Sequence, residues 1–258
     1  MKQRIWTGII GGVLFLFFVI QGGLSFAVLI SLLAMIAYVE FLQMARIPLF
    51  SLSALLGFLF LIGHFLPYVT PLTKADERWI IGFVFFLFIQ MILSKNRFSI
   101  EQAGSLLLGT LYISFGFSIF IETRFTHGLD MIFFILLIIW ATDTGAYFVG
   151  RKLGKHKLWP AISPNKSIEG SLGGLVSAII TAILLESLLR LWADWIYVVG
   201  IASLISILGQ IGDLAESSLK RHYQVKDSGN LLPGHGGVLD RFDSILFVFP
   251  ILYILQLI

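Results

Sequence analysis

The chain has 258 residues, of which 57% are hydrophobic and 13% are charged, and its formal net charge is +3. Soluble domains carry about 25% charged residues, so this composition excludes an ordinary soluble protein and predicts an all-α, polytopic integral membrane protein. The absence of cysteine excludes disulfides, thiolate metal sites and thiol nucleophiles, and nothing in the charge balance predicts a nucleic-acid partner.

The apolar segments predict about nine transmembrane helices, because a bilayer core about 30 Å thick requires about 20 apolar residues in a helix. The predicted spans are residues 5–20, 24–42, 49–69, 79–93, 103–121, 129–149, 172–191, 195–211 and 244–258. Residues 21–23, Gln-Gly-Gly, predict a very tight turn between the first two spans. We expect a single membrane-embedded domain over residues 1–258, with five spans in residues 1–128 and the polar loops in residues 129–258.

The positive-inside rule orients these spans. With the N-terminus in the cytoplasm, the basic residues on the opposite side are Lys74, Arg78, Arg124 and Arg190, which leaves 14 of the 18 Lys and Arg on the cytoplasmic side. Both large polar loops, residues 150–170 and 212–243, fall on the cytoplasmic side.

The first large loop is basic, and Pro160 and Pro164 prevent a simple helix there. Its basic residues could merely contact anionic lipid headgroups, but Lys166 precedes a helix start, where backbone N–H groups favour a phosphate. Asp143 lies about six residues inside the sixth span, and a carboxylate at that depth indicates a polar cavity. A structural ion pair with Arg151 or Lys166 is the alternative.

The second large loop gathers acids, bases and glycines. Asp213 and Ser217 share one helical face, and Asp240 and Asp243 share another at the start of the last span. Helix capping is the alternative for these two aspartates, as a solvated basic loop is for the lysines and arginine between the two pairs. Grouped carboxylates suit Mg²⁺ and surrounding bases suit phosphate, so the pattern indicates phosphoryl or nucleotidyl transfer on a lipid.

Residues 212–244, GDLAESSLKRHYQVKDSGNLLPGHGGVLDRFDS, closely resemble the signature of the phosphatidate cytidylyltransferase (CDP-diacylglycerol synthase) family. Two upstream segments, residues 143–155 and 163–170, also look like the family, with Asn165 and Ser167 where Lys and Thr are expected. The resemblance covers residues 140–258, and the first five spans carry only generic membrane character.

This resemblance implies a Mg²⁺-dependent nucleotidyltransferase of phospholipid biosynthesis, which converts CTP and phosphatidic acid to CDP-diacylglycerol and pyrophosphate. It implies a multi-pass protein of the inner cell membrane with its active site facing the cytoplasm. A second cation and a homodimer are open alternatives.

The implied site residues fall into three groups. The metal ligands are Asp213 and Asp240, with Asp143 and Asp243 as further ligands. The residues expected to carry the catalysis are Asp213, Asp240, Lys220 and Arg241. The residues expected to bind substrate are Lys166, Ser217, Lys220, Arg221, Lys226, His235, Gly236, Gly237 and Arg241.

Two other functions are weighed against this interpretation. A CTP-dependent polyprenol or phytol kinase would transfer the γ-phosphoryl group to a lipid alcohol, but the complete signature argues against it. An ion-coupled transporter would use Asp143 and Asp213 to bind the coupling ion, but such proteins show inverted repeats, and none is apparent in the sequence.

Overall fold

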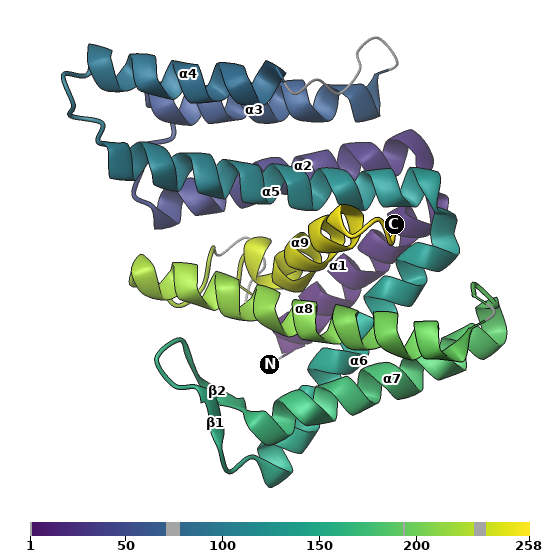
Figure 1. Ribbon diagram of the computed structural model, residues 1–258. Coiled ribbons are helices and arrows are strands. Elements are labelled where there is room, and N and C mark those ends of the chain that lie inside the picture. Colours follow the sequence, from purple (N-terminus) through teal and green to yellow (C-terminus); the bar gives the residue numbers. More distant parts are fainter. Residues whose placement is uncertain (1, 71–77, 193, 230–235) are drawn as a thin grey trace. The chain divides into compact units, whose positions relative to one another are not determined.

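The computed structural model describes residues 2–70, 78–192, 194–229 and 236–258, with side chains from Gly8 onward. The described residues form nine helices and one two-stranded antiparallel sheet (Figure 1). The helices are α1 (Lys2–Gln21), α2 (Gly23–Met44), α3 (Leu52–Val69), α4 (Arg78–Leu93), α5 (Ile100–Thr126), α6 (Gly128–Leu153), α7 (Ile168–Leu189), α8 (Trp195–His222) and α9 (Leu239–Ile254). The strands are β1 (Lys157–Trp159) and β2 (Ser163–Ser167).

The helices confirm the predicted all-α membrane class. Six of those described, α2, α3, α5, α6, α7 and α8, are long and apolar enough to cross a membrane, while α4 and the described part of α1 are shorter apolar helices. Large apolar side chains such as Ile92 and Leu188 are exposed, as expected of surfaces that face lipid rather than water. The predicted tight turn is confirmed: Gly22 separates α1 from α2 with a φ of 65°, a conformation that favours glycine.

The described chain packs as two compact units. Unit 1 comprises Met1–Glu122 and Val225–Arg241, and unit 2 comprises Thr123–Gln224 and Phe242–Ile258. The chain therefore leaves the first unit in the last turn of α5, returns to it between the end of α8 and the first turn of α9, and then leaves again. The expectation of a single domain stays a prediction.

Aromatic side chains fill the core of unit 1. Phe41 of α2 packs on Gly109 of α5, where any Cβ would collide with the phenyl ring. Tyr38 lies fully buried and donates to the carbonyl oxygen of Ala54 in α3 at 3.2 Å. Helices α3 and α4 lie side by side (Figure 1).

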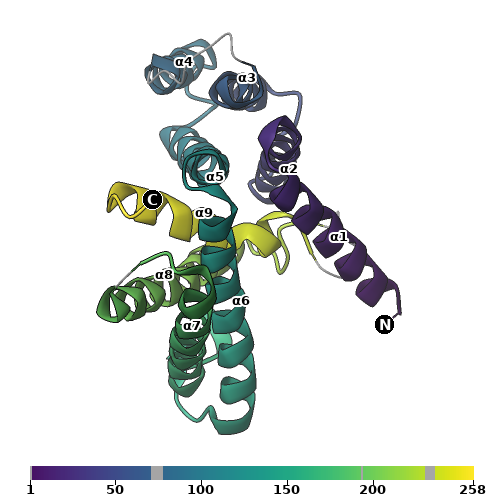
Figure 2. The same cartoon turned by 90° about the vertical axis from the view of Figure 1, so that its right-hand side faces the viewer.

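Small residues bring α6 and α7 together in unit 2, where the two helices run alongside each other (Figures 1 and 2). A Cβ on Gly174 would lie 2.8 Å from the carbonyl oxygen of Thr142, and one on Gly145 would lie 2.8 Å from the carbonyl oxygen of Gly173. This close approach is typical of packing between membrane helices. It brings Asp143 of α6 to the same pocket as the start of α7.

The polar loops are shorter than predicted. Helix α8 continues through the polar residues to His222, and α9 begins at Leu239 rather than at residue 244. A salt bridge between Glu216 and Lys220, four residues apart, supports the helical extension. The first loop likewise contains the β1–β2 hairpin.

Candidate active site

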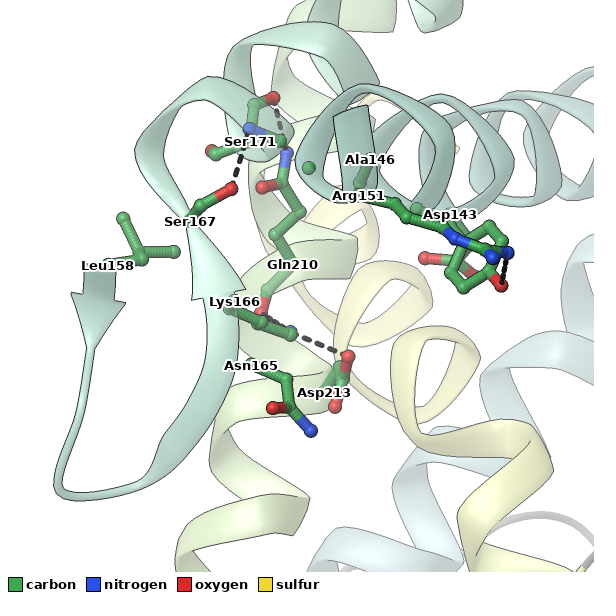
Figure 3. A pocket seen from close by; sticks show the side chains of 13 residues that line it. Asp143, Ala146, Arg151, Leu158, Asn165, Lys166, Ser167, Ser171, Gln210 and Asp213 are labelled. Carbon is green, nitrogen blue, oxygen red and sulfur yellow. Dashed lines mark hydrogen bonds and ion pairs between the residues drawn. The ribbon is translucent and has the colours of Figure 1, made fainter. Parts of the chain in front are cut away.

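A pocket of about 480 Å³ opens in unit 2 among α6, the β1–β2 hairpin, α7 and α8 (Figure 3). Three of the predicted site residues line it: Asp143 from α6, Lys166 from β2 and Asp213 from α8. Asp143 therefore lines a pocket together with the charged side chains of Lys166 and Asp213, while its function there stays a prediction.

The Lys166 ammonium and the Asp213 carboxylate form the central ion pair of the pocket. The Lys166 Nζ lies 2.5 Å from Asp213 Oδ2, and both side chains keep part of their surface exposed. The same Nζ donates to the carbonyl oxygen of Gln210 at 3.4 Å. The two charged groups point toward each other in Figure 3, so a substrate phosphate that binds Lys166 must compete with a carboxylate.

Local structure holds each member of this pair. Ser167, the residue after Lys166, caps α7, with its hydroxyl accepting from the Gly170 N–H at 3.1 Å. The Gly170 N–H therefore already has a partner, and it is not free to bind an anion alongside Lys166, as the sequence led us to expect. On α8, the Ser217 hydroxyl donates to Asp213 Oδ1 at 3.3 Å, across the predicted spacing of four residues.

Further charges surround the pair. Asp243, which precedes the predicted ninth span, interacts electrostatically with Asp213, Asp143 and Lys220. Burial, together with the charges of Asp213 and Asp143, raises the pKa of Asp243 to about 7. The ammonium of Lys220 lies 2.5 Å from the carboxylate of Glu216, whose side chain is buried. Negative charge is thus concentrated in this part of unit 2.

The other part of the signature, residues 225–241, belongs to unit 1. Asp240 Oδ2 accepts hydrogen bonds from the Ser228 N–H at 2.8 Å, the Ser228 hydroxyl at 2.9 Å and the Gly237 N–H at 2.8 Å. Gly236 has a φ of 84°, and a Cβ there would lie 2.5 Å from Asp240 Oδ2. This oxygen therefore ties Ser228 and Gly237 together at the start of α9, and the role of Asp240 as a metal ligand or a helix cap stays a prediction.

Comparison with known proteins tests the family assignment. The family model described as "Cytidylyltransferase family" matches residues 2–258. This chain belongs to the cytidylyltransferase family. The resemblance read from the sequence is therefore confirmed, and it extends over the first five spans as well as residues 140–258.

Individual relatives of this cytidylyltransferase match along nearly their whole length. A protein of Bacillus subtilis (strain 168) named phosphatidate cytidylyltransferase is 48% identical over 99% of this chain and 97% of its own. Proteins of the same name from Staphylococcus aureus (strain COL) and Staphylococcus epidermidis (strain ATCC 35984) are 43% and 44% identical, each over 99% of this chain and 98% of their own. Family membership makes the protein a nucleotidyltransferase.

The remaining predicted substrate residues have varied settings in the cytidylyltransferase. Arg221, at the end of α8, donates from Nε to the carbonyl oxygen of Ile162 at 3.2 Å and so ties α8 to the β1–β2 hairpin. Lys226 and Arg241 are exposed, and Gly237 is buried. His235 lies outside the described residues. The roles of all these residues stay predictions.

The carboxylates of unit 2 fit Mg²⁺ in their chemistry. Hard carboxylate oxygens are the donors that this ion prefers, and Asp213, Asp143 and Asp243 supply them within one electrostatic cluster. Within the described ranges, no group of three acidic or histidine side chains forms a preformed cation site. In this structure Lys166 supplies positive charge to Asp213.

Sequence reasoning overlooked Glu40 in the second predicted span. Its side chain is 4% exposed, and its carboxylate accepts hydrogen bonds from the signature segment in unit 1. The available signal was a single acid in a long apolar helix, which is costly unless it is paired. Gln210, which lines the pocket beside Asp213, was also overlooked.

Proposed function

We propose that this protein is a phosphatidate cytidylyltransferase, which converts CTP and phosphatidic acid to CDP-diacylglycerol and pyrophosphate. The observation that carries the proposal is the match along the whole chain to relatives of that name, one of them 48% identical over 99% of the chain. The pocket in unit 2, with its paired lysine and aspartate, supports it as a phosphate-binding site.

The reaction exchanges one phosphoanhydride bond for another. A phosphate oxygen of phosphatidic acid attacks the α-phosphorus of CTP, the bond from that phosphorus to the bridging oxygen breaks, and pyrophosphate leaves with the electron pair. The attacking phosphate is already anionic near neutral pH, so the reaction requires no strong general base. The main physical obstacle is repulsion between two anions, which basic groups and a cation offset.

Lys166 and Asp213 are suited to this task as an exchangeable pair. A phosphate oxygen of the substrate would replace Asp213 as the partner of the Lys166 ammonium. The Asp213 carboxylate would then be available to bind a cation. Until the substrate binds, the ion pair keeps both side chains charged and partly shielded from solvent. Lys220, Arg221 and Arg241 are proposed as further phosphate contacts.

We further propose that Mg²⁺ is the cofactor, held by Asp213 with Asp143 and Asp243. When bound, Mg²⁺ would neutralise charge on the triphosphate and on the departing pyrophosphate. Asp240 stays a predicted ligand. The protein is proposed to lie in the cell membrane with this pocket facing the cytoplasm, where CTP is available.

Isotope transfer tests the reaction. Purified protein is incubated with phosphatidic acid and CTP labelled at the α-phosphorus, with and without Mg²⁺. We expect the label in the lipid product, with equimolar pyrophosphate release and no transfer without the ion. CTP labelled at the γ-phosphorus should leave the lipid unlabelled.

The same experiment separates the alternative enzyme. A lipid-alcohol kinase would pass the γ-label to a polyprenol or phytol acceptor and release CDP. Transfer of the γ-label to such an acceptor, with none of the α-label reaching phosphatidic acid, would overturn the proposed function.

A further inference from the structure

Glu40, in the apolar helix α2, is buried against residues nearly 200 positions later in the chain. Its Oε1 accepts from the Val238 N–H at 2.8 Å, and its Oε2 accepts from the Leu239 N–H at 3.0 Å and the Ser228 hydroxyl at 3.2 Å. All of these residues belong to unit 1. A buried carboxylate is costly unless hydrogen bonds compensate it, and here one segment supplies all three of these donors.

The position of these donors matters because Leu239 is the first residue of α9. The opening N–H groups of a helix have no partner within the helix, and a negative charge placed there is favoured by the helix dipole. Glu40 therefore caps α9 from a different helix. Glu40 is also four residues from the end of α2, so the contact joins that end of α2 to the signature segment.

Two glycines of the signature make room for this carboxylate. A Cβ on Gly229 would lie 2.6 Å from Glu40 Oε1, and a Cβ on Gly237 would collide with Glu40 Oε2 and with the Ser228 hydroxyl. Neither position can carry a side chain while Glu40 occupies its site. Gly237, predicted from the sequence to bind substrate, thus has a packing reason to be glycine.

Ser228 connects Glu40 to Asp240. Its hydroxyl lies 3.2 Å from Glu40 Oε2 and 2.9 Å from Asp240 Oδ2, and it accepts from the Asp240 N–H at 3.3 Å. The Ser228 side chain is 3% exposed. The hydroxyl has one proton and donates to one of the two carboxylates at a time, while the Ser228 N–H donates to Asp240 Oδ2 at 2.8 Å. Ser228 therefore couples the position of the Asp240 carboxylate to that of Glu40.

We propose that Glu40 is a positioning residue for the cytidylyltransferase reaction: it anchors the signature segment to α2 and fixes the Asp240 carboxylate at the start of α9 through Ser228. The inference rests on the proposed function for its catalytic consequence. It gives the N-terminal helices, which carry no other predicted site residue, a direct part in building the site.

The test compares Glu40→Gln with a matched control, Glu186→Gln. Glu186 of α7 is also a buried glutamate, 3% exposed, and it accepts from the backbone N–H groups of Leu191 and Trp192 in unit 2. Both substitutions replace one acceptor oxygen by an NH2 group, which cannot accept a hydrogen bond, so both should lower the thermal midpoint in detergent. Only Glu40→Gln should lower kcat, by roughly ten- to a hundredfold, as expected when the partner of a functional carboxylate is lost, with the KM for CTP within about threefold.

Hydrogen exchange supplies a readout independent of activity. In Glu40→Gln, the peptide covering Gly236–Arg241 should exchange faster, while peptides of α6 and α7 should keep the wild-type rate. Glu40→Asp, which keeps the charge, should recover part of both the kcat and the protection. If Glu40→Gln fails to fold, Glu40→Asp and Ser228→Ala provide the same comparison.

Equal kcat losses in Glu40→Gln and Glu186→Gln would overturn the proposal, as would an unchanged kcat or unchanged exchange of the Gly236–Arg241 peptide in Glu40→Gln. The wild-type enzyme, measured in the same assay, keeps the two ideas apart. If it forms no CDP-diacylglycerol, the proposed function fails, whereas the exchange data still decide whether Glu40 holds the segment.

Discussion

At the scale of single residues, the ion pair between Lys166 and Asp213 is the contact most directly connected to the proposed chemistry. The two groups meet at 2.5 Å at the surface of the pocket, with 25% and 36% of their side chains exposed. A pair that is partly solvated gains little net stability. Its value therefore lies in presenting two oppositely charged groups that can exchange partners when substrate binds.

A double-mutant cycle on this pair tests the exchange. We expect Asp213→Asn and Lys166→Met each to lower kcat/KM by about a hundredfold or more, since each removes a charge aimed at a developing charge. Because the two residues act as a unit, the double variant should lose much less than the product of the single losses. Steady-state kinetics measure all four proteins.

Asp194→Asn is the control for the cycle. Asp194 caps α8 at its other end, where Oδ1 accepts from the Ile196 N–H, and asparagine also caps well. Its kcat/KM should stay near the wild-type value. Fully additive losses for Lys166 and Asp213 would contradict the exchange.

Removal of the metal tests whether the reaction requires Mg²⁺ and whether Asp213 helps to hold it. EDTA should abolish product formation, and added Mg²⁺ should restore it, because repulsion between CTP and the lipid phosphate is then offset again. In Asp213→Asn, the Mg²⁺ concentration needed for half-maximal rate should rise. Full activity of the wild-type enzyme in excess EDTA would exclude the proposed cofactor.

Among the helices, the packed pair α6 and α7 sets the positions of Asp143 and Lys166 in the pocket. Asp143 projects from α6, and Lys166 directly precedes the cap of α7. Glycines hold the two backbones close, so a change of one methyl group at the contact should move one helix against the other.

Gly174→Ala tests this contact. Its Cβ would lie 2.8 Å from the Thr142 carbonyl oxygen, an overlap of the kind that costs about 1–3 kcal/mol. The thermal midpoint in detergent should therefore fall by several degrees, and kcat should fall with it. Intrinsic fluorescence and the label-transfer assay give the two readings.

Gly200→Ala is the matched control, because a Cβ on Gly200 of α8 meets nothing within 4 Å. Alanine is favoured over glycine within a helix by about 1 kcal/mol, so this variant should be as stable as the wild type or slightly more so. A Gly174→Ala protein as stable as Gly200→Ala would show that α6 and α7 tolerate separation.

At the scale of the whole molecule, the main expectation is the orientation in the membrane. The natural absence of cysteine allows single cysteines to report it. Ala161→Cys and His222→Cys, both at exposed positions, should react with an impermeant reagent only from the cytoplasmic side, and the exposed Thr126→Cys should react only from the other side. Labelling of Ala161→Cys and His222→Cys from opposite sides would contradict the predicted topology.

The length of the apolar runs was sufficient to predict the fold class and most of the helices, and the glycines of residues 21–23 predicted the tight turn at Gly22. These signals failed where apolar and polar residues share one helix. Helix α8 runs through Asp213 and Lys220 to His222, since its side chains pair across four residues after the apolar stretch ends. Hydrophobicity predicts where a helix leaves the lipid, whereas the hydrogen bonds of the helix can continue into the polar residues beyond that point.

The amino-acid sequence by itself determined that this is a membrane protein and which segments hold its charged residues, because composition and spacing are local properties. It also carried the family signature, which the comparisons confirm. Only the tertiary structure decided which polar side chains meet: Lys166 with Asp213, 47 positions apart in the numbering, and Glu40 with Ser228, 188 positions apart. The physical reason is that both contacts join segments far apart in the chain, and the packing of the assembled helices sets which of these segments approach each other.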